Sequence, residues 1–157
     1  MPLFLRLFVV LAAFVLGGCA SAPRDSAPPS AAPQVGERAA AHALKVVGAP
    51  YRYGGASPSR GFDCSGLVQY SYKYAGLTLP HNTEKQRRAS RPIRRADLRR
   101  GDLLFFDEEG KKNSHVGIYI GGGKFVHAPS SGKHVRTDRM DAPYWRKHLS
   151  EIRRVAA

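Results

Sequence analysis

Cysteine is scarce in this sequence: of its 157 residues, only Cys19 and Cys64 carry a thiol. Two cysteines are too few for a disulfide-rich scaffold, and they lie too far apart to form the Cys-x-x-Cys pair of a structural zinc site. At most one disulfide is open to the chain, so the setting of each thiol decides its role.

Acidic residues are also few: the sequence has 12 Asp and Glu against 25 Lys and Arg, which gives a formal net charge of +13. Such a balance points to an acidic partner. No helix-turn-helix, zinc-finger or aromatic RNA-binding signature is present, so we do not expect nucleic acid. Anionic lipid, lipopolysaccharide and cell-wall polymer remain as partners, beside a basic surface that is merely solvated.

The chain lacks an apolar run long enough to span a membrane, which takes roughly 20 residues. The longest run, residues 7–16, follows Arg6 and ends in Gly17-Gly18-Cys19. This pattern resembles a bacterial lipobox, in which cleavage leaves the cysteine as a lipidated N-terminus. We therefore expect residues 1–19 to be a lipoprotein signal peptide, Cys19 to carry lipid such as palmitate, and the protein to face the periplasm. An ordinary signal peptide is the alternative.

Bulky apolar residues are missing from residues 20–35, which are rich in Ala, Pro and Ser. Such a segment cannot bury enough surface to fold, so we expect a flexible tether there. Ala20 directly after the cysteine resembles lipoproteins sorted to the outer membrane. Residues 36–157 are enough for one domain, which we expect to be a membrane-tethered monomer.

The order of patterns in the domain predicts an α+β fold, because helices come first and strands follow. Helical periodicity covers residues 37–47 and 64–75, with Asp63 as the cap of the second helix. Thr83 and Gln86 form a capping-box pattern for a short helix over residues 84–88. Strands are expected at residues 103–106, 116–120, 124–128, 135–136 and 152–155.

Three consecutive glycines at residues 121–123 predict a hairpin between two of these strands. A three-residue loop pairs Ile120 with Lys124, and puts His127 opposite Gly117 with His115 on the same face. We expect Gly117 to leave space for an imidazole. A two-residue turn would place the two histidines on opposite faces.

Cys64 is the candidate nucleophile, because a thiol at a helix N-terminus beside an imidazole is expected to have a lowered pKa. His115 would accept the thiol proton and His127 would orient His115. Tyr51, or Tyr53 in its place, would stabilise an oxyanion together with the backbone N–H of Cys64. A buried, inert Cys64 and a zinc site formed with the two histidines are the alternatives. No short paired-ligand spacing supports zinc, so we expect no metal and no cofactor.

At these residues the sequence resembles the NlpC-type cell-wall cysteine peptidases, a papain-like family, and within it the lipoprotein murein endopeptidases of the MepS (Spr) kind. Four blocks carry the resemblance: residues 51–55 (YRYGG), 62–68 (FDCSGLV), 101–106 (GDLLFF), and 115–121 (HVGIYIG) with 125–128 (FVHA). The resemblance implies N-terminal helices packed on a central antiparallel sheet. It also implies Cys64 as nucleophile, His115 as base, His127 as the third member and Tyr51 near the oxyanion.

The family also implies the substrate, which is the stem peptides of peptidoglycan. The bond would be either the D-alanyl–diaminopimelate cross-link or the bond between D-glutamate and diaminopimelate within one stem. We expect hydrolysis of such bonds during wall growth or remodelling. Two alternatives keep the fold but change the function: a non-catalytic wall-binding or regulatory lipoprotein, and a thiol acyltransferase.

Overall fold

The computed structural model describes residues 31–130 and 134–156. The expected signal peptide, Cys19 and most of the expected tether lie outside the described residues. Within the described part of the chain, no helix has the length and apolar character needed to cross a membrane.

Helices and short strands make up the N-terminal half, and a six-stranded sheet makes up the rest. The first half contains α1 (Ala31–Lys45), β1 (Ala56–Ser57), β2 (Gly61–Phe62), α2 (Cys64–Tyr74), α3 (Thr83–Arg88), β3 (Ser90–Pro92) and the 3-10 turn η1 (Arg95–Asp97). The second half contains β4 (Leu103–Glu108), β5 (Lys111–Gly121), β6 (Lys124–His127), β7 (Arg136–Arg139), α4 (Pro143–His148) and β8 (Leu149–Val155).

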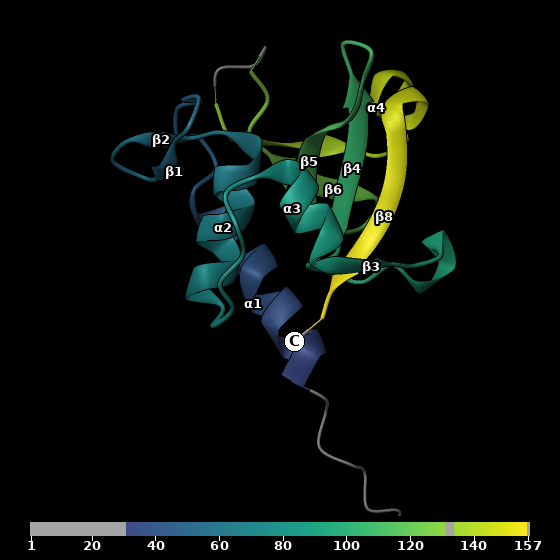
Figure 1. The fold of residues 1–157 in the computed structure, drawn as a ribbon, viewed down its shortest axis with the longest axis horizontal. Coiled ribbons are helices and arrows are strands. Elements are labelled where there is room, and N and C mark those ends of the chain that lie inside the picture. Colours follow the sequence, from purple (N-terminus) through teal and green to yellow (C-terminus); the bar gives the residue numbers. More distant parts are fainter. Residues whose placement is uncertain (1–30, 131–133, 157) are drawn as a thin grey trace, which may run out of the picture.

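The sheet has the strand order β3-β8-β4-β5-β6-β7, and every neighbouring pair is antiparallel. Helices α1, α2 and α3 lie on one side of the sheet, whereas α4 lies at the N-terminal end of β8 (Figure 1). The α+β class and the central antiparallel sheet expected from the sequence are thus confirmed.

Helix α1 begins at Ala31, six residues before the expected start and inside the range assigned to the tether. Pro33 falls in the first turn, where a helix tolerates a missing N–H. Of the apolar residues whose spacing predicts this helix, Ala40 is buried, but Leu44 and Val47 are exposed. The helix and the residue that follows it bury a stripe of mostly small side chains against the core: Val35, Ala39, Ala40, Ala43 and Val46.

Helix α2 starts as predicted, because the carboxylate of Asp63 accepts a hydrogen bond from the Gly66 N–H at 2.7 Å. The cap of α3 differs from the prediction. Asn82, not Thr83, accepts the capping bond from the Lys85 N–H at 2.9 Å. Gln86 is fully buried and donates to the carbonyls of Ser65 and Pro80, which ties α3 to the start of α2.

The sheet separates two apolar clusters. Strand alternation places Leu103, Phe105, Val116, Ile118 and Val126 in the cluster that α1 and α2 cover. The alternate residues form a second cluster with α4: Leu104, Phe106, Phe125, Met140 and Trp145. His115 lies opposite Phe106 in the β4–β5 register, so the histidines belong to the second face.

The β5–β6 hairpin keeps the expected register by a different route. Ile118 pairs with Val126 as predicted, but Gly121 pairs with Lys124. The turn is therefore shorter than expected, and a register shift between Tyr119 and Gly121 compensates for the missing residue. Gly117 has a different role as well: a Cβ there would meet the ring of Phe125 at 2.6 Å, so the space belongs to Phe125 and not to an imidazole.

Candidate active site

Cys64 is the first residue of α2 and is partly exposed. Its Sγ lies 3.8 Å from the hydroxyl Oγ1 of Thr83 at the start of α3. The backbone N–H groups of Ser65 and Val116 also interact with the sulfur. The thiol is therefore held where α2, α3 and β5 meet.

The pKa of the Cys64 thiol is raised above its ordinary value of 9.0, contrary to the expectation from the helix N-terminus. Desolvation is the largest cause, and the Asp63 carboxylate adds to it, because both disfavour the thiolate. The Thr83 hydroxyl and the N–H groups of Val116 and Ser65 oppose the shift without overcoming it. In this geometry Cys64 is a thiol and needs a base before it can attack.

His115 and His127 lie side by side, as the hairpin register predicted. The Nε2 of His115 and the Nδ1 of His127 are 2.8 Å apart, and both residues are buried. The other ring nitrogen of His127 lies 2.9 Å from Oδ2 of Asp138. Trp145 stacks on His115 with 5.6 Å between ring centroids and meets His127 edge-on at 4.7 Å.

The free nitrogen of His115, Nδ1, faces the same cavity as the thiol. Cys64 and His115 both line this cavity of about 270 Å³. The closest anionic group to Nδ1 is the Glu108 carboxylate at 3.6 Å, which also accepts a hydrogen bond from the Tyr144 hydroxyl. No hydrogen bond joins Cys64 to His115, two residues that the structure describes. The cavity brings base and thiol together, but the bond between them is not yet formed.

Both site histidines are held neutral at pH 7. The pKa of His115 is lowered to about 3, mainly by burial and in smaller part by electrostatic interaction with His127 and Arg136. Burial also lowers the pKa of His127 to about 4, although the hydrogen bond and charge of Asp138 act in the opposite direction. A neutral imidazole is the form that accepts a proton.

Tyr51 lies beside the thiol, whereas its alternative, Tyr53, is 89% exposed. Burial raises the pKa of the Tyr51 phenol, and electrostatic interaction with Cys64 is the next cause. Its hydroxyl therefore stays protonated and is able to donate a hydrogen bond. This favours Tyr51 over Tyr53 for the oxyanion position.

A second hollow of about 510 Å³ extends from the thiol along α3, and it shares Tyr51, Cys64 and Ser114 with the first cavity. The two together form a groove that crosses the thiol, as a peptide chain would require. His81 lines this groove and its Nε2 lies 2.8 Å from Oδ1 of Asp63. Asp63 thus caps the helix and anchors His81 in the wall of the groove.

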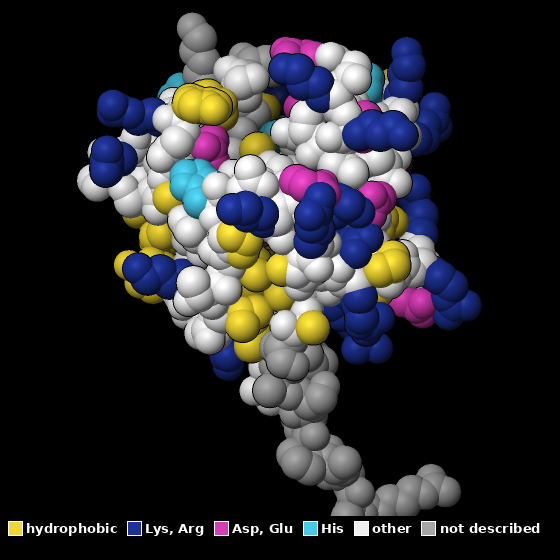
Figure 2. Space-filling model, viewed as in Figure 1, with side chains coloured by type: hydrophobic (Ala, Val, Ile, Leu, Met, Phe, Trp, Pro, Cys, Tyr) yellow, Lys and Arg dark blue, Asp and Glu magenta, His cyan; other side chains and the backbone are white. Residues whose placement is uncertain are grey.

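On the face seen in Figure 2, positive charge is spread around the surface instead of being collected in one place. Figure 2 shows Lys and Arg side chains around one face, with Asp and Glu among them. Several arginines are paired locally: Arg87 and Arg88 with Glu84, and Arg94 with Asp97. The +13 balance therefore gives this face no single binding stripe.

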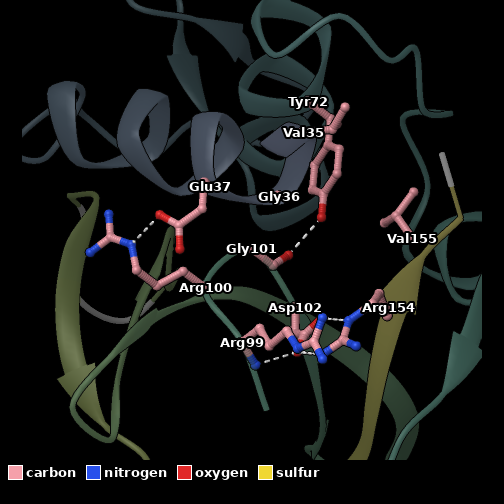
Figure 3. A pocket seen from close by; sticks show the side chains of 10 residues that line it. All are labelled: Val35, Gly36, Glu37, Tyr72, Arg99, Arg100, Gly101, Asp102, Arg154 and Val155. Atoms are coloured by element: carbon pink, nitrogen blue, oxygen red, sulfur yellow. Dashed lines mark hydrogen bonds and ion pairs between the residues drawn. The ribbon is translucent and has the colours of Figure 1, made fainter. Parts of the chain in front are cut away.

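A separate cavity of about 310 Å³ lies between the beginning of α1 and the turn at Gly101 (Figure 3). Its polar groups bind one another: Tyr72 donates to the Gly101 carbonyl at 2.6 Å, and Arg154 pairs with Asp102 at 2.7 Å. It shares no residue with the groove at Cys64 and has no Cys or His in its lining. Among the residues that the structure describes, the one thiol, that of Cys64, lies in the groove.

Comparison with known proteins identifies the domain. The model of the NlpC/P60 family matches residues 48–154, which is more than half of the chain. The chain belongs to the NlpC/P60 family. The match contains Tyr51, Cys64, His115 and His127, and it confirms the resemblance that the sequence motifs carry.

Relatives and solved structures agree with this assignment. Murein DD-endopeptidase MepH of Escherichia coli is 40% identical over 116 residues, which are 71% of this chain and 43% of that protein. Bifunctional muramidase/DL-endopeptidase CwlT of Bacillus subtilis is 44% identical over 115 residues, 72% of this chain and 34% of that protein. A lipoprotein-like NLP/P60 structure from Staphylococcus aureus has a TM-score of 0.70 and 37% identity, over 78% of this chain and 42% of that one. This chain spans less than half the length of each.

Sequence reasoning missed the contacts that three further residues make with Cys64 and the two histidines. Asp138 holds His127, Glu108 faces His115, and Thr83 contacts the thiol. Thr83 was expected only as part of a capping box, and Asp138 and Glu108 stand in no motif, because each reaches the site through tertiary contact.

Proposed function

We propose that this NlpC/P60 protein is a cysteine endopeptidase that hydrolyses amide bonds in the peptides of peptidoglycan. The observation that carries the proposal is the shared cavity of Cys64 and His115, with His115 held from behind by His127 at 2.8 Å. Nucleophile, base and orienting group are the three parts that a thiol hydrolase needs.

The reaction begins with transfer of the Cys64 proton to Nδ1 of His115. The sulfur attacks the carbonyl carbon, and His115 then gives its proton to the nitrogen of the leaving amine. This breaks the C–N bond and leaves a thioester on Cys64. Water attacks the thioester as His115 takes its proton, and the released thiolate regains a proton from His115.

The first step needs a change at His115, because Nδ1 faces Glu108 and not the sulfur in the resting geometry. A substrate carbonyl in the groove brings the reacting groups together and excludes water from the cavity. Catalytic hydrogen bonds are often long before substrate is bound and tighten in the complex. The raised pKa of Cys64 fits the same scheme, since proton transfer is coupled to attack.

The tetrahedral intermediate needs donors for its oxyanion. In our proposal these are the Tyr51 hydroxyl and the backbone N–H of Cys64. As the first residue of α2, Cys64 has an N–H that no turn of the helix can pair. Loss of one such donor typically costs about 100- to 1000-fold in kcat.

The relatives suggest the substrate class but leave its bond open. MepH is named a murein DD-endopeptidase and CwlT a DL-endopeptidase. We infer that the groove takes a peptidoglycan stem peptide and that hydrolysis serves wall growth or remodelling. The cross-link between D-alanine and diaminopimelate is our preferred bond.

We also propose that the domain works from a membrane anchor in the cell envelope. Cleavage before Cys19 would remove residues 1–18 and leave the lipidated Cys19 as the N-terminus, on a tether that ends where α1 begins at Ala31. The sorting signal favours the outer membrane, and a single tethered copy is the proposed state. Mass spectrometry of the mature N-terminus would detect the lipid, and replacement of Cys19 by Ser would release the protein.

Defined muropeptides test the proposed reaction. A cross-linked dimer and a single stem peptide are incubated separately with wild type and with Cys64→Ala, and the masses of the products are measured by mass spectrometry. The dimer should give two monomers with wild type only. Cleavage of the single stem instead would assign the bond between D-glutamate and diaminopimelate. Equal products from wild type and Cys64→Ala would exclude hydrolysis by Cys64.

A further inference from the structure

One carboxylate oxygen behind the two histidines accepts several hydrogen bonds. Oδ2 of Asp138 lies 2.9 Å from Nε2 of His127, 3.1 Å from Nε of Arg136 and 3.0 Å from Nε1 of Trp145. Burial opposes ionisation of Asp138, but the hydrogen bonds and electrostatic interactions with His127 and Arg136 outweigh it and lower the pKa of the carboxyl. The group is an ionised acceptor, so each partner must donate to it.

This acceptor decides which nitrogens of the histidines carry protons. Because Asp138 accepts, the proton of neutral His127 is on Nε2, and its Nδ1 is left with a lone pair. That lone pair accepts at 2.8 Å, so the proton of His115 is on Nε2 as well. Nδ1 of His115 is then unprotonated where it faces the cavity of Cys64. The chain of bonds leaves His115 one tautomer, and it is the one that acts as a base.

We propose that Asp138 is a positioning residue that sets the tautomers of both histidines and extends the Cys64, His115, His127 group by a fourth member. The effect of Asp138 on catalysis rests on the proposed function, whereas its hydrogen bonds do not depend on that function. Arg136 and Trp145 fix the carboxylate from two other directions. The indole also packs against both imidazole rings, so it holds the rings and the carboxylate in one arrangement.

The first test needs no activity. Two-dimensional ¹H–¹⁵N correlation spectra through the imidazole carbons distinguish Nδ1–H from Nε2–H histidines in the folded protein at pH 7. The wild type should show His115 and His127 both as Nε2–H. If either histidine carries its proton on Nδ1, Asp138 does not set the tautomers of both residues and the inference is overturned.

The second test removes the acceptor. Asp138→Ala should shift His127 toward the Nδ1–H form and lower kcat at least about tenfold with KM within about twofold, since tautomer loss in such groups acts on the chemical step. Asp141→Ala is the matched control: it removes an exposed carboxylate paired with Arg139 at the end of β7 and touches neither histidine. It should keep the wild-type spectrum and kcat.

The outcomes separate this inference from the proposed function. If Asp138→Ala keeps both tautomers and the wild-type kcat, the positioning role is refuted. If it does not fold, the wild-type spectrum alone decides the inference. If wild type shows the expected tautomers but cuts no muropeptide, the proposed function fails while the proton arrangement stands.

Discussion

Acidification from pH 7 to pH 5 should destabilise this protein strongly, because two histidines are buried without charge. Their pKa values fall from 6.5 to about 3 for His115 and about 4 for His127 on folding. Below pH 6.5 these two histidines bind protons in the unfolded chain but stay unprotonated in the native state. The free energy of unfolding therefore has its full value above pH 6.5 and decreases as the pH falls below it.

The magnitude follows from the shifts. At pH 5 the unfolded form of each histidine is protonated and the native form is not, which costs about 2 kcal/mol for each and roughly 4 kcal/mol together. Asp138, with an ordinary pKa of 3.8, stays ionised in both states across this window. The loss is a large part of the stability of a domain, which is typically about 5–15 kcal/mol.

Urea denaturation followed by circular dichroism at pH 7, 6 and 5 measures this loss. The variant His127→Gln should show about half of the wild-type dependence, because one of the two titrating groups is gone. A change of less than about 1 kcal/mol in the wild type would refute the reasoning, since such a change is below that of a single buried histidine.

Three further predictions concern the groove and its supports. Iodoacetamide should alkylate Cys64 slowly at pH 7 and faster as the pH rises past 9, because the pKa of the thiol is raised; a plateau below pH 8 would contradict this. Gly117→Ala should displace the Phe125 ring and abolish or sharply reduce peptidase activity, because the new Cβ would lie 2.6 Å from that ring; wild-type activity would show that the ring moves freely. Asp63→Ala should lower the free energy of unfolding by about 1 kcal/mol through loss of the helix cap, measured by urea denaturation, and a neutral result would assign the cap to another group.

Local patterns predicted the parts of the fold that local chemistry controls. Asp63 caps α2 because its short carboxylate reaches the unpaired N–H of Gly66 in the first turn. The two histidines share a face because the apolar residues of β5 and β6 admit only one register. That register held although the turn was shorter than expected, since core burial outweighs turn length.

Other features depended on neighbours that no local pattern reveals. α1 starts at Ala31 because Val35 and the alanines after it meet α2 and the sheet, which composition alone could not show. The pKa of Cys64 is raised and not lowered, because burial outweighs the donors around the sulfur. Asp138 was missed because β7 pairs with β6 and carries it to His127 across the sheet.

The most direct test of the account is digestion of purified sacculi by wild type and by Cys64→Ser, with the new amino and carboxyl termini counted. The serine keeps the size and hydrogen bonding of the side chain but is a far weaker nucleophile at this site. The account predicts new termini in equal numbers with wild type and almost none with the serine variant. Release by both proteins at the same rate, or by neither, would contradict a peptidoglycan endopeptidase that depends on the Cys64 thiol.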